Sequence, residues 1–458
     1  MRIVVSGATG LLGRALTSKL IENGDSVAVL TRNVQKAKEV LPLGIDVFHW
    51  DPSALVPPSE SLEGGQAVVH LTGETIQGRW TKTKKDRILQ SREMSTCNLV
   101  SAISAMETPP LRVVSASAVG YYGDRGNEKL TESSKRGEGF LSDVVGVWEG
   151  RLEPLSGSGI NINHLRLGVI LSEYGGALKQ MVLPWRLGLG VKIGDGSQWW
   201  PWIHIDDAVG LIEHSLKGDM LGGPVNAVAP EQVTQTEFAN ALARALGRPR
   251  IFRVPEFLIR ALIGEMSCEL TASRRVVDSD TSYKYRFPSL DKALRNLLPQ
   301  GRDKNHGLKI FQTEMQVDAP IDTVFDFFAN PANLEEITPP WLNFKVMSPQ
   351  SLDIGFGTII DYRLHLHRVP VTWQSQITEW DPPRRFVDVQ NKGPYRHWEH
   401  THEFTSYEGR TLVRDSVKYK VPGGSMVDKL LVRRDLERIF AYRQRKLREL
   451  LVVKPMVS

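Results

Sequence analysis

Three glycines near the start of the chain, Gly7, Gly10 and Gly13, have the spacing of a turn that can hold a phosphate. They follow the apolar run at residues 3–5, so we expect the order strand, glycine turn, helix. In this order Gly7 permits a tight turn, Gly10 lets backbone N–H groups approach a pyrophosphate, and Gly13 lets the helix pack close to the strand. The N-terminus of the helix also favours the charge of the phosphates. The sequence therefore predicts a dinucleotide site; the alternative is a turn that only joins a strand to a helix. The predicted contacts are Gly7, Thr9, Gly10, Leu11, Leu12 and Gly13.

The end of the second expected strand bears on which dinucleotide would bind. An enzyme that uses NAD usually has Asp or Glu there, which accepts hydrogen bonds from the ribose 2′-hydroxyl. This chain has Thr31 and Arg32 instead, with no acidic residue. A guanidinium can pair with a 2′-phosphate through two hydrogen bonds, so we predict that NADP(H) is preferred over NAD(H). The alternative is that Arg32 only caps a surface turn. Further cofactor contacts are predicted after later strands, at Asp51, Leu71, Thr72, Gly73 and Ser115.

Length and composition limit the class of protein. With 458 residues the chain is too long for one ordinary domain, and a hydrophobic content of 41% allows substantial cores. The net charge of +5 is small for this length, so nucleic acid is not expected as the main partner. No apolar run reaches the roughly 18 residues that span a bilayer, so we expect no integral membrane segment. The two cysteines are far apart in the sequence, which fits a reducing compartment and predicts a cytoplasmic protein. The oligomeric state is left open.

The elements that must position these residues alternate between strand-like and helix-like stretches up to about residue 230. This alternation is typical of an α/β Rossmann fold, a doubly wound parallel sheet whose ligands lie beyond the carboxyl ends of the strands. Residues 231–298 are predicted to form a small, mostly helical extension on the substrate side. Residues 299–308 have almost no apolar side chain and are predicted to be a linker. From 309 to 455, alternating strands and a long last helix predict a separate α+β domain.

Several motifs in the first 298 residues occur together in the order of a known family. They are the segments Ser115–Gly123 and Trp202–Asp207 and the shorter Arg79–Thr81 and Ser91–Arg92. With the glycine turn, they resemble the atypical short-chain dehydrogenase/reductase family, often labelled NAD-dependent epimerase or cell-division-inhibitor-like. Residues 247–297 look like the C-terminal extension of that family. The resemblance implies a Rossmann domain at residues 1–230 and a nicotinamide cofactor.

The catalytic residues of that family are only partly present. Its members normally use Ser or Thr together with a Tyr-x-x-x-Lys pair, in which the lysine acidifies the phenol. Ser117 matches the serine, but the window Phe140–Glu149, where the pair would fall, contains neither Tyr nor Lys. A positioned acid or base contributes about 10²- to 10⁴-fold to a rate, so the usual alcohol–ketone route is not expected. Two alternatives stay open: Tyr121 or Tyr122 supplies the phenol beside Ser117, or the site binds NADP(H) without fast turnover.

Substrate contacts are predicted around the expected cleft. Arg79 would bind an anionic group of the substrate. Trp80 lies with Arg79 in a loop that faces the expected cleft. Trp202 would help to form an apolar wall, and His204, which ends the same segment, is a further predicted contact. The alternatives are a surface ion pair for Arg79 and simple packing for the tryptophans.

Residues 309–452 are similar to the SRPBCC superfamily of START/Bet v 1-like helix-grip domains. The resemblance is carried by motifs that include Asp318–Phe328, Trp380–Arg384 and Gly393–Trp398. It implies a curved antiparallel sheet around the long last helix and a cavity that binds a small apolar or amphipathic molecule. The last helix also carries many basic side chains, which are expected to face solvent while its apolar stripe packs inward. The alternative is that this helix lies on an anionic membrane surface.

Five histidines in this segment raise the question of a metal site. They are His365, His367, His397, His400 and His402. Along a strand His400 and His402 share one face, and His397 points to the other. No cysteine accompanies them and their spacing has no metal signature, so we expect no metal and expect polar residues that line or flank the cavity.

Together these features predict an NADP(H)-binding protein that is an oxidoreductase or epimerase-like enzyme on an apolar or amphipathic small molecule. The second domain would capture or deliver that molecule, because fusion raises the local concentration of one site near the other. The competing hypothesis is a non-catalytic protein that senses NADP(H). A link to cell division is suggested only by family labels.

Overall fold

The computed structural model divides the chain into two compact units, Met1–Gly301 and Arg302–Ser458. Each unit has its own sheet and its own hydrophobic core. The structure describes all residues except 43, 187–189, 219, 221, 249–251, 279–281, 299–308, 350–353, 368, 408, 422–427, 429–431 and 452–458. The predicted linker, 299–308, therefore lies outside the described residues. Within the described part, no helix has the length and apolar composition needed to cross a bilayer.

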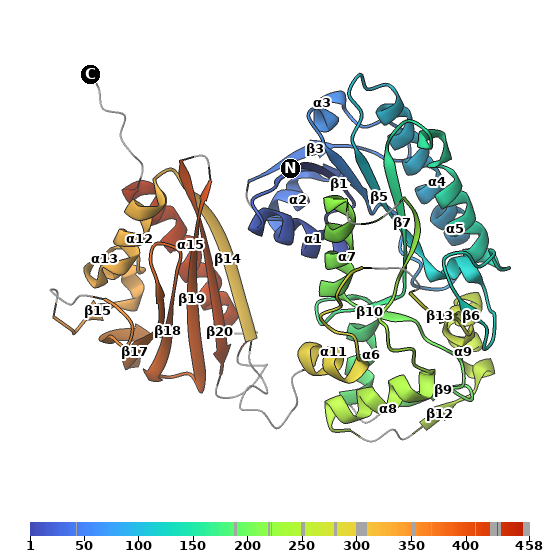
Figure 1. Ribbon diagram of the computed structural model, residues 1–458. Helices are drawn as coiled ribbons and strands as arrows, with labels where there is room; N and C mark the ends of the chain where they lie inside the picture. Colours follow the sequence, from blue (N-terminus) through green and yellow to red (C-terminus); the bar gives the residue numbers. More distant parts are fainter. Residues whose placement is uncertain are drawn as a thin grey trace. The chain divides into compact units, whose positions relative to one another are not determined.

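Seven parallel strands form the sheet of the first unit, in the order β11-β7-β5-β4-β1-β2-β3 (Figure 1). Their bounds are β1 (Arg2–Ser6), β2 (Ser26–Thr31), β3 (Ile45–His49), β4 (Ala67–His70), β5 (Arg112–Ala118), β7 (Asn161–Leu167) and β11 (Gly223–Ala227). The order reverses at β1, because β2 and β3 extend to one side and the later strands to the other. In doubly wound sheets ligands bind at this switch point, beyond the carboxyl ends of the strands. The predicted fold of this unit is confirmed.

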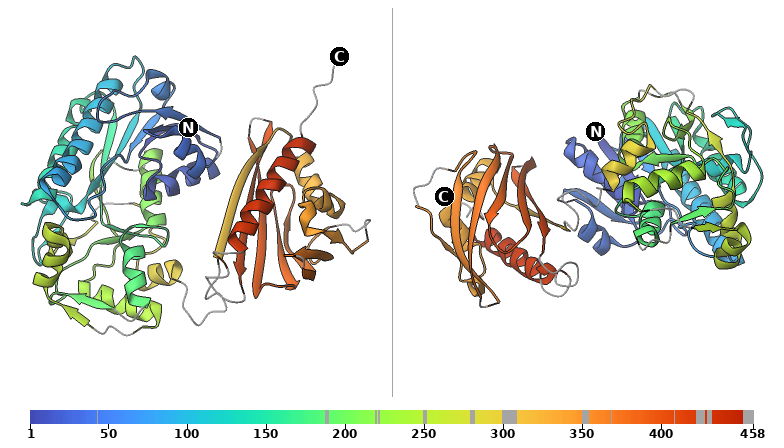
Figure 2. Two further views of the ribbon diagram at one scale, coloured as in Figure 1. Left: turned by 180° about the vertical axis from the view of Figure 1, so that it is seen from behind. Right: turned by 90° about the horizontal axis from the view of Figure 1, so that it is seen from below.

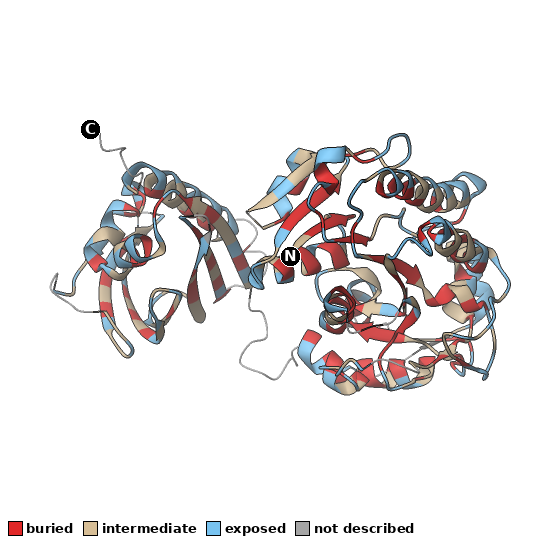
Figure 3. Ribbon diagram, turned by 45° about the horizontal axis from the view of Figure 1, so that its top comes forward, coloured by how far each residue is buried: buried red, intermediate tan, exposed pale blue. Residues whose placement is uncertain are grey.

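Helices cover both faces of this sheet (Figure 1). The helices up to residue 217 are α1 (Leu11–Glu22), α2 (Val34–Val40), α3 (Ser59–Leu62), α4 (Lys82–Ser104), α5 (Phe140–Gly150), α6 (Gly176–Arg186) and α7 (Ile205–Lys217). Alternate residues of β1 face opposite layers: Ile3 and Val5 pack with α1 and α7, whereas Val4 packs with α4. A strand buried on both faces is a continuous apolar run, which is the pattern of β1. Figure 3 shows the buried residues along the strands and on the inward sides of the helices.

Short elements complete the first unit. They are the turns η1 (Val119–Tyr122) and η2 (Glu153–Leu155) and the short strands β6 (Lys129–Leu130), β8 (Val169–Leu171), β9 (Val191–Ile193), β10 (Trp202–His204), β12 (Phe252–Val254) and β13 (Arg275–Val276). After residue 231 come α8 (Gln235–Leu246), α9 (Glu256–Ile263), η3 (Gly264–Met266), α10 (Ser267–Thr271) and α11 (Leu290–Leu297). A capping box begins α8, because the Thr234 hydroxyl accepts from the N–H of Glu237 and the Glu237 carboxylate accepts from the N–H of Thr234.

Seven antiparallel strands form the sheet of the second unit, in the order β14-β20-β19-β18-β17-β16-β15. Their bounds are β14 (Lys309–Val317), β15 (Lys345–Val346), β16 (Ile359–Leu366), β17 (Val369–Asp381), β18 (Arg385–Lys392), β19 (His397–Tyr407) and β20 (Arg410–Lys420). The helical elements are α12 (Ile321–Ala329), α13 (Pro331–Glu336), η4 (Pro340–Leu342) and α15 (Arg433–Leu450). Figure 2 shows the sheet curving around α15, whose Leu436, Phe440 and Leu447 are buried in the core. The predicted α+β helix-grip fold is confirmed.

Candidate functional site

The turn between β1 and α1 has the geometry of an anion site. Gly7 has a φ of +74°, and a Cβ atom there would lie 2.7 Å from the carbonyl group of Leu71. A Cβ atom on Gly13 would lie 2.5 Å from the carbonyl oxygen of Gly7. Gly10 begins α1 without a side-chain cap, and the first turn of the helix has no acidic residue. The N–H groups at this helix end therefore face no competing anion, and the helix dipole favours a negative ligand there.

The loop that follows β4 lies directly beside this turn. It contains Leu71, whose carbonyl group approaches Gly7, and continues through Thr72 and Gly73. Gly73 is exposed, and a Cβ atom there would lie 3.1 Å from the guanidinium of Arg92. The fold thus brings together two of the predicted cofactor segments, residues 7–13 and 71–73, at the switch point of the sheet.

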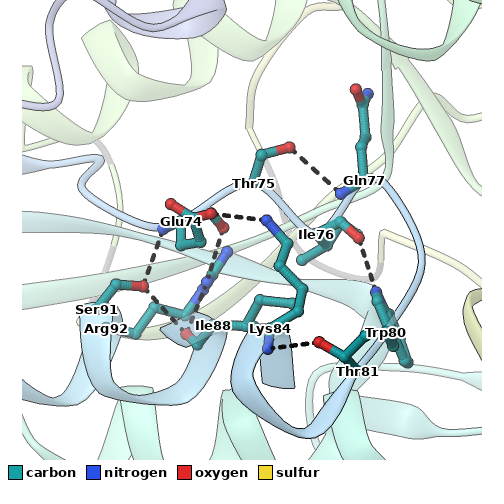
Figure 4. A network of polar contacts seen from close by, with 10 residues as sticks. All are labelled: Glu74, Thr75, Ile76, Gln77, Trp80, Thr81, Lys84, Ile88, Ser91 and Arg92. Carbon is teal, nitrogen blue, oxygen red and sulfur yellow. Dashed lines mark hydrogen bonds and ion pairs between the residues drawn. The ribbon is translucent and has the colours of Figure 1, made fainter. Parts of the chain in front are cut away.

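A polar network ties this loop to α4 (Figure 4). The N–H of Glu74 donates to the Ser91 hydroxyl at 2.9 Å, and Lys84 pairs with the Glu74 carboxylate at 2.7 Å. The Arg92 guanidinium donates to the carbonyl oxygens of Glu74 and Ile88 at 3.1 and 3.0 Å. Burial lowers the pKa of Arg92 to about 10. The motif Ser91–Arg92 therefore positions the loop.

The end of β2, where the 2′-phosphate is predicted to bind, carries an exposed Arg32. The cap of α2 is Asn33, so the alternative role of Arg32 as a cap is filled by its neighbour. Asp51 accepts hydrogen bonds from the hydroxyl and N–H of Ser53 at 2.6 and 3.1 Å, which hold the pKa of its carboxyl below the usual value. The charge of Arg32 acts on Asp51 in the same direction. Asp51 is therefore engaged in its own turn, and its predicted contact with adenine remains a prediction.

Ser117, the serine of the predicted catalytic set, is held in a buried ion-pair network. Its Oγ donates to Oε1 of Glu149 on α5 at 2.5 Å. Arg166 on β7 donates to both oxygens of the same carboxylate, from Nε at 2.9 Å and from Nη2 at 2.8 Å. Because the guanidinium engages both oxygens, Glu149 is a structural partner of Ser117 and not a free base.

The two neighbouring tyrosines differ in their availability. Tyr122 is fully buried; its hydroxyl donates to Oδ1 of Asn226 at 2.7 Å and accepts from Nη1 of Arg166 at 2.9 Å. Burial raises the pKa of Tyr122, which opposes the ionised form that a catalytic phenol needs. Tyr121 is half-buried, and the Arg166 guanidinium lies 3.5 Å from its ring centroid. Among the described residues no hydrogen bond holds the Tyr121 hydroxyl, so of the two phenols this one is free to reach a ligand.

Three of the predicted substrate contacts lie in the core. Trp80 and Trp202 are buried, and each donates its indole N–H to a backbone carbonyl, at 2.8 and 3.1 Å. His204 is 1% exposed and caps α7 by accepting from the N–H of Asp206 at 3.0 Å. These positions favour packing and capping, the alternative stated for the tryptophans, and do not support substrate contact.

Two further predicted contacts have different surroundings. Arg79 is exposed and packs beside Gly264 of the C-terminal extension. A Cβ atom on Gly264 would lie 3.2 Å from the Cγ atom of Arg79. Ser115 is 1% exposed and donates to the carbonyl of Ala116 at 3.1 Å. Arg79 therefore stays available to an anionic substrate group, whereas Ser115 is engaged inside β5.

The second unit contains an apolar cavity of about 170 Å³. Aromatic and aliphatic side chains form most of its lining. Trp373, Tyr395 and Trp398 cluster on one side, with ring centroids 4.8 Å apart for the last two and 5.1 Å apart for the tryptophans. Arg443 of α15 also lines the cavity, so the expectation that the basic side chains of this helix face solvent is wrong for Arg443. The lining of this cavity suits a small apolar molecule.

Four titratable side chains meet on the inner face of this sheet: Asp388 of β18, His400 and His402 of β19, and Asp415 of β20. Burial raises the pKa of both carboxyls, but the charges and hydrogen bonds of the two histidines hold them below the usual value. Burial lowers the pKa of His400, and its neighbour His402 acts in the same direction. For His402 burial also lowers the pKa, but the two carboxylates outweigh it and raise the pKa above the usual value.

Sequence reasoning missed the groups that these clusters draw from other elements. It placed His400 and His402 on one face, and both are buried, but it did not bring Asp388 or Asp415 to them. The window Phe140–Glu149 was considered only as the place for a Tyr and a Lys, so the partner role of Glu149 was missed. Arg166, a charged residue inside the apolar run of β7, is the signal that could have revealed the network.

Comparison with known proteins finds a separate family for each unit. Residues 3–225 match the NAD dependent epimerase/dehydratase family, and residues 254–297 match a domain of unknown function. Residues 317–448 match the family described as polyketide cyclase / dehydrase and lipid transport. These matches confirm both resemblances that were drawn from the motifs.

Relatives match the first unit over almost their whole length. Epimerase family protein YfhF of Bacillus subtilis is 33% identical over 302 residues, which is 65% of this chain and 98% of the relative. Epimerase family protein SDR39U1 of Homo sapiens is 34% identical over 306 residues, 65% of this chain and 100% of the relative. The crystal structure of human SDR39U1 (isoform 2) with NADPH has a TM-score of 0.59 at 34% identity and covers 65% of this chain and 99% of that chain. The nucleoside-diphosphate sugar epimerase from Corynebacterium glutamicum has a TM-score of 0.53 at 32% identity, covering 65% of this chain and 58% of that chain.

Proposed function

This chain belongs to the NAD-dependent epimerase/dehydratase family, and on that premise we propose that its first unit binds NADP(H) and its second unit an apolar or amphipathic small molecule. The observation that carries the cofactor proposal is the uncapped N-terminus of α1, beside Gly7 and the loop of residues 71–73. A pyrophosphate at this end would meet backbone N–H groups and the favourable end of the helix dipole. The glycines let the backbone of this turn pack closely, because a Cβ atom on Gly7 or Gly13 would lie less than 3 Å from backbone atoms. The crystal structure of human SDR39U1 with NADPH supports the choice of a nicotinamide dinucleotide.

The preference for NADP(H) over NAD(H) rests on the residues after β2. Arg32 is exposed there, the adjacent Asn33 is occupied as the cap of α2, and no acidic side chain follows the strand to accept from a ribose 2′-hydroxyl. A guanidinium at this place would form charge-assisted hydrogen bonds with a 2′-phosphate. The more general inference, that the first unit binds a nicotinamide cofactor, does not depend on Arg32.

The reaction that we propose is redox or epimerase-like chemistry on an apolar or amphipathic molecule. The nicotinamide would supply the hydride chemistry when bound. Among the candidate groups of this chain, Tyr121 has the available hydroxyl, and it lies just beyond the carboxyl end of β5. Tyr121 would exchange a proton with the substrate oxygen, and the guanidinium of Arg166, 3.5 Å from the ring centroid, would hold the ring in place. Ser117 would have a positioning role, because its hydroxyl donates a hydrogen bond to the carboxylate of Glu149.

A second candidate function, sensing of NADP(H) without turnover, is favoured by the same network. Ser117, Tyr122 and Glu149 are all bonded to partners inside the unit, so three polar groups near the predicted site are already satisfied. In this alternative the bound cofactor would alter the unit's stability or contacts, and the second unit would bind its own ligand. The two functions share the cofactor site and differ in whether Tyr121 transfers a proton.

Calorimetric titration of the full chain with NADPH and NADH tests the cofactor proposal. Hydrogen bonds to charged groups contribute about 1.5–3 kcal/mol, so Arg32→Ala should weaken NADPH binding by about 10- to 100-fold. Its effect on NADH should be small. Lys38→Ala removes an exposed charge of the same sign from α2 and serves as the matched control. An equal loss for both cofactors would remove the 2′-phosphate role, and no heat with either would remove the site.

A second assay separates turnover from sensing. The NADPH-loaded protein is mixed with small-molecule extracts, and the absorbance of the reduced nicotinamide is followed over time. The proposal predicts oxidation that is lost in Tyr121→Phe and kept in Tyr122→Phe variants that still bind NADPH. Tight NADPH binding without oxidation would argue against net reduction of a substrate. Because an epimerase regenerates its cofactor, the sensing function would be supported only if the extracts also showed no change in their small molecules.

A further inference from the structure

We propose that the second unit holds a divalent transition-metal ion on Asp388, His400 and His402. One ligand atom from each of these residues lies within 4.8 Å of the other two. Oδ1 of Asp388 is 3.7 Å from Nδ1 of His400 and 3.5 Å from Nε2 of His402. The site belongs to the second unit alone and does not depend on the proposed NADP(H) site.

These separations suit ligands around an ion better than direct hydrogen bonds. Hydrogen bonds between nitrogen and oxygen are about 2.7–3.2 Å long. Zinc binds imidazole nitrogen and carboxylate oxygen at about 2.0–2.2 Å, so two ligands of a tetrahedral ion lie about 3.4 Å apart. The two distances from Asp388 are therefore close to those that an ion between the groups would require.

The outer nitrogens of both imidazoles face a second carboxylate. Nε2 of His400 donates to Oδ1 of Asp415 at 2.8 Å, and Nδ1 of His402 lies 2.8 Å from the same oxygen. Metal-bound histidines characteristically donate their other ring N–H to a carboxylate, which orients the ring and raises its basicity. Asp388 is oriented in a similar way. The Ser375 hydroxyl donates to Oδ2 of Asp388 at 3.1 Å, and Oδ1 points toward the histidines. Outer hydrogen bonds thus hold His400 and Asp388 in place, whereas Nδ1 of His402 lies beside the Asp415 carboxylate without forming a hydrogen bond.

The charge of the cluster also favours a cation. Asp415, His402 and His400 are 3%, 4% and 6% exposed, and Asp388 lies beside them. Buried charges in proteins are paired or coordinate metals. An ion held by Asp388 and the two histidines would also lie near Asp415, so two acidic side chains would face one cation within a small volume.

The register of the sheet explains why the spacing along one strand does not reveal this set. Asp388 pairs with His400 across β18 and β19, and His402 pairs with Asp415 across β19 and β20. The expectation of no metal considered only residues that are close in sequence. Two strands supply the three ligands and a third supplies Asp415, so the spacing along β19 alone does not show the carboxylates.

Three protein ligands leave a coordination position for another molecule. Asp388, His400 and His402 all line the apolar cavity, so the fourth position of a tetrahedral ion would open into it. Arg443 lines the same cavity, and its buried Nε has no hydrogen-bond partner among the described residues. An apolar molecule with a carboxylate or enolate oxygen fits this arrangement, because the oxygen would meet the ion and the guanidinium.

Titration of the untagged full chain with Co²⁺ alone, after treatment with a chelator, tests the proposal. A tetrahedral Co²⁺ site gives a visible absorption band, and we expect this band to saturate at one equivalent and to disappear when Zn²⁺ is added. Asp388→Asn and His402→Gln should weaken Co²⁺ binding by more than 10-fold, and Asp415→Asn by about 10- to 100-fold. His397→Gln, on the opposite face of the same strand, is the matched control and should leave the titration unchanged.

Near-ultraviolet circular dichroism of the tryptophans around the cavity shows whether each variant keeps its fold. The absence of the band in the wild-type chain would overturn the proposal. A band that persists with unchanged affinity in folded Asp388→Asn and His402→Gln variants would overturn it as well. Loss of the band in His397→Gln to the same extent would place the bound ion elsewhere and have the same consequence.

Discussion

Replacing Arg166 by Met tests whether the network around Glu149 stabilises the first unit. Arg166 donates two hydrogen bonds to Glu149, one to the hydroxyl of Tyr122 and one to the carbonyl of Glu132. Methionine fills part of the same apolar volume but removes all four donors. The carboxylate of Glu149 then keeps the Ser117 hydroxyl as a partner and loses its counter-ion.

The magnitude follows from the burial of the pair. The side chains of Arg166 and Glu149 are 4% and 14% exposed. Removing one partner of a buried ion pair costs about 3–5 kcal/mol, and we expect the lower end because Glu149 retains some contact with water. At about 2–4 °C per kcal/mol for a large domain, a loss of about 3 kcal/mol lowers the Tm by about 6–12 °C. Adding Glu149→Leu to Arg166→Met should recover part of this loss, because no unpaired charge then remains.

Differential scanning calorimetry of the full chain measures these changes, and hydrogen exchange assigns each transition to a unit. Arg151→Met is the control: it removes a pair with Glu93 whose side chains are 48% and 27% exposed, and it should change stability by less than about 1 kcal/mol. The reasoning is refuted if Arg166→Met melts with the wild type, or if the double variant is less stable than the single one.

Three further predictions concern other parts of the chain. Burial lowers the pKa of His70 from 6.5 to about 4, so its contribution to stability is present above pH 6.5 and is lost as the pH falls toward 4. We expect the free energy of unfolding to fall by up to about 3 kcal/mol over this range, and urea unfolding should show a flatter pH dependence for His70→Gln. A Cβ atom on Gly13 would lie 2.5 Å from the carbonyl of Gly7, so Gly13→Ala should weaken NADPH binding in calorimetry by at least about 10-fold, whereas Gly150→Ala, which meets nothing within 4 Å, should not. Arg443→Met should weaken binding of dodecanoate to the cavity by about 10-fold and leave dodecanol binding nearly unchanged in a fluorescence displacement assay; equal losses for both would argue against an anionic ligand.

The parts that could be predicted from the sequence depend on neighbouring residues. The apolar run Ile3–Val5 followed by Gly7 specifies a buried strand and a tight turn, because the β1 side chains are buried on both faces and Gly7 adopts a positive φ. The long last helix could be predicted for the same reason, since its apolar residues recur on one side. In both cases the residues that determine the structure lie close together in the sequence.

The parts that could not be predicted depend on contacts between distant elements. Ser117 meets Glu149 of α5 and, through it, Arg166 of β7, so its role as a bonded core residue is set by packing. Trp202 and Trp80 have the residue type of a ligand wall, but their burial is decided by the helices that cover them. Arg443 lies in a basic stretch and faces the cavity because of the rotation of α15 against the sheet. Apart from the charged Arg166 within β7, none of these placements leaves a signal in the local spacing.

Hydrogen–deuterium exchange of the full chain, with and without NADPH, tests most directly the claim that backbone N–H groups at the start of α1 bind the cofactor's phosphates. We expect slower exchange at residues 10–13 and in the adjoining loop of residues 71–73 when NADPH is added, while the second unit is unchanged. Saturating NADPH that leaves the exchange of residues 10–13 as it was would contradict the account.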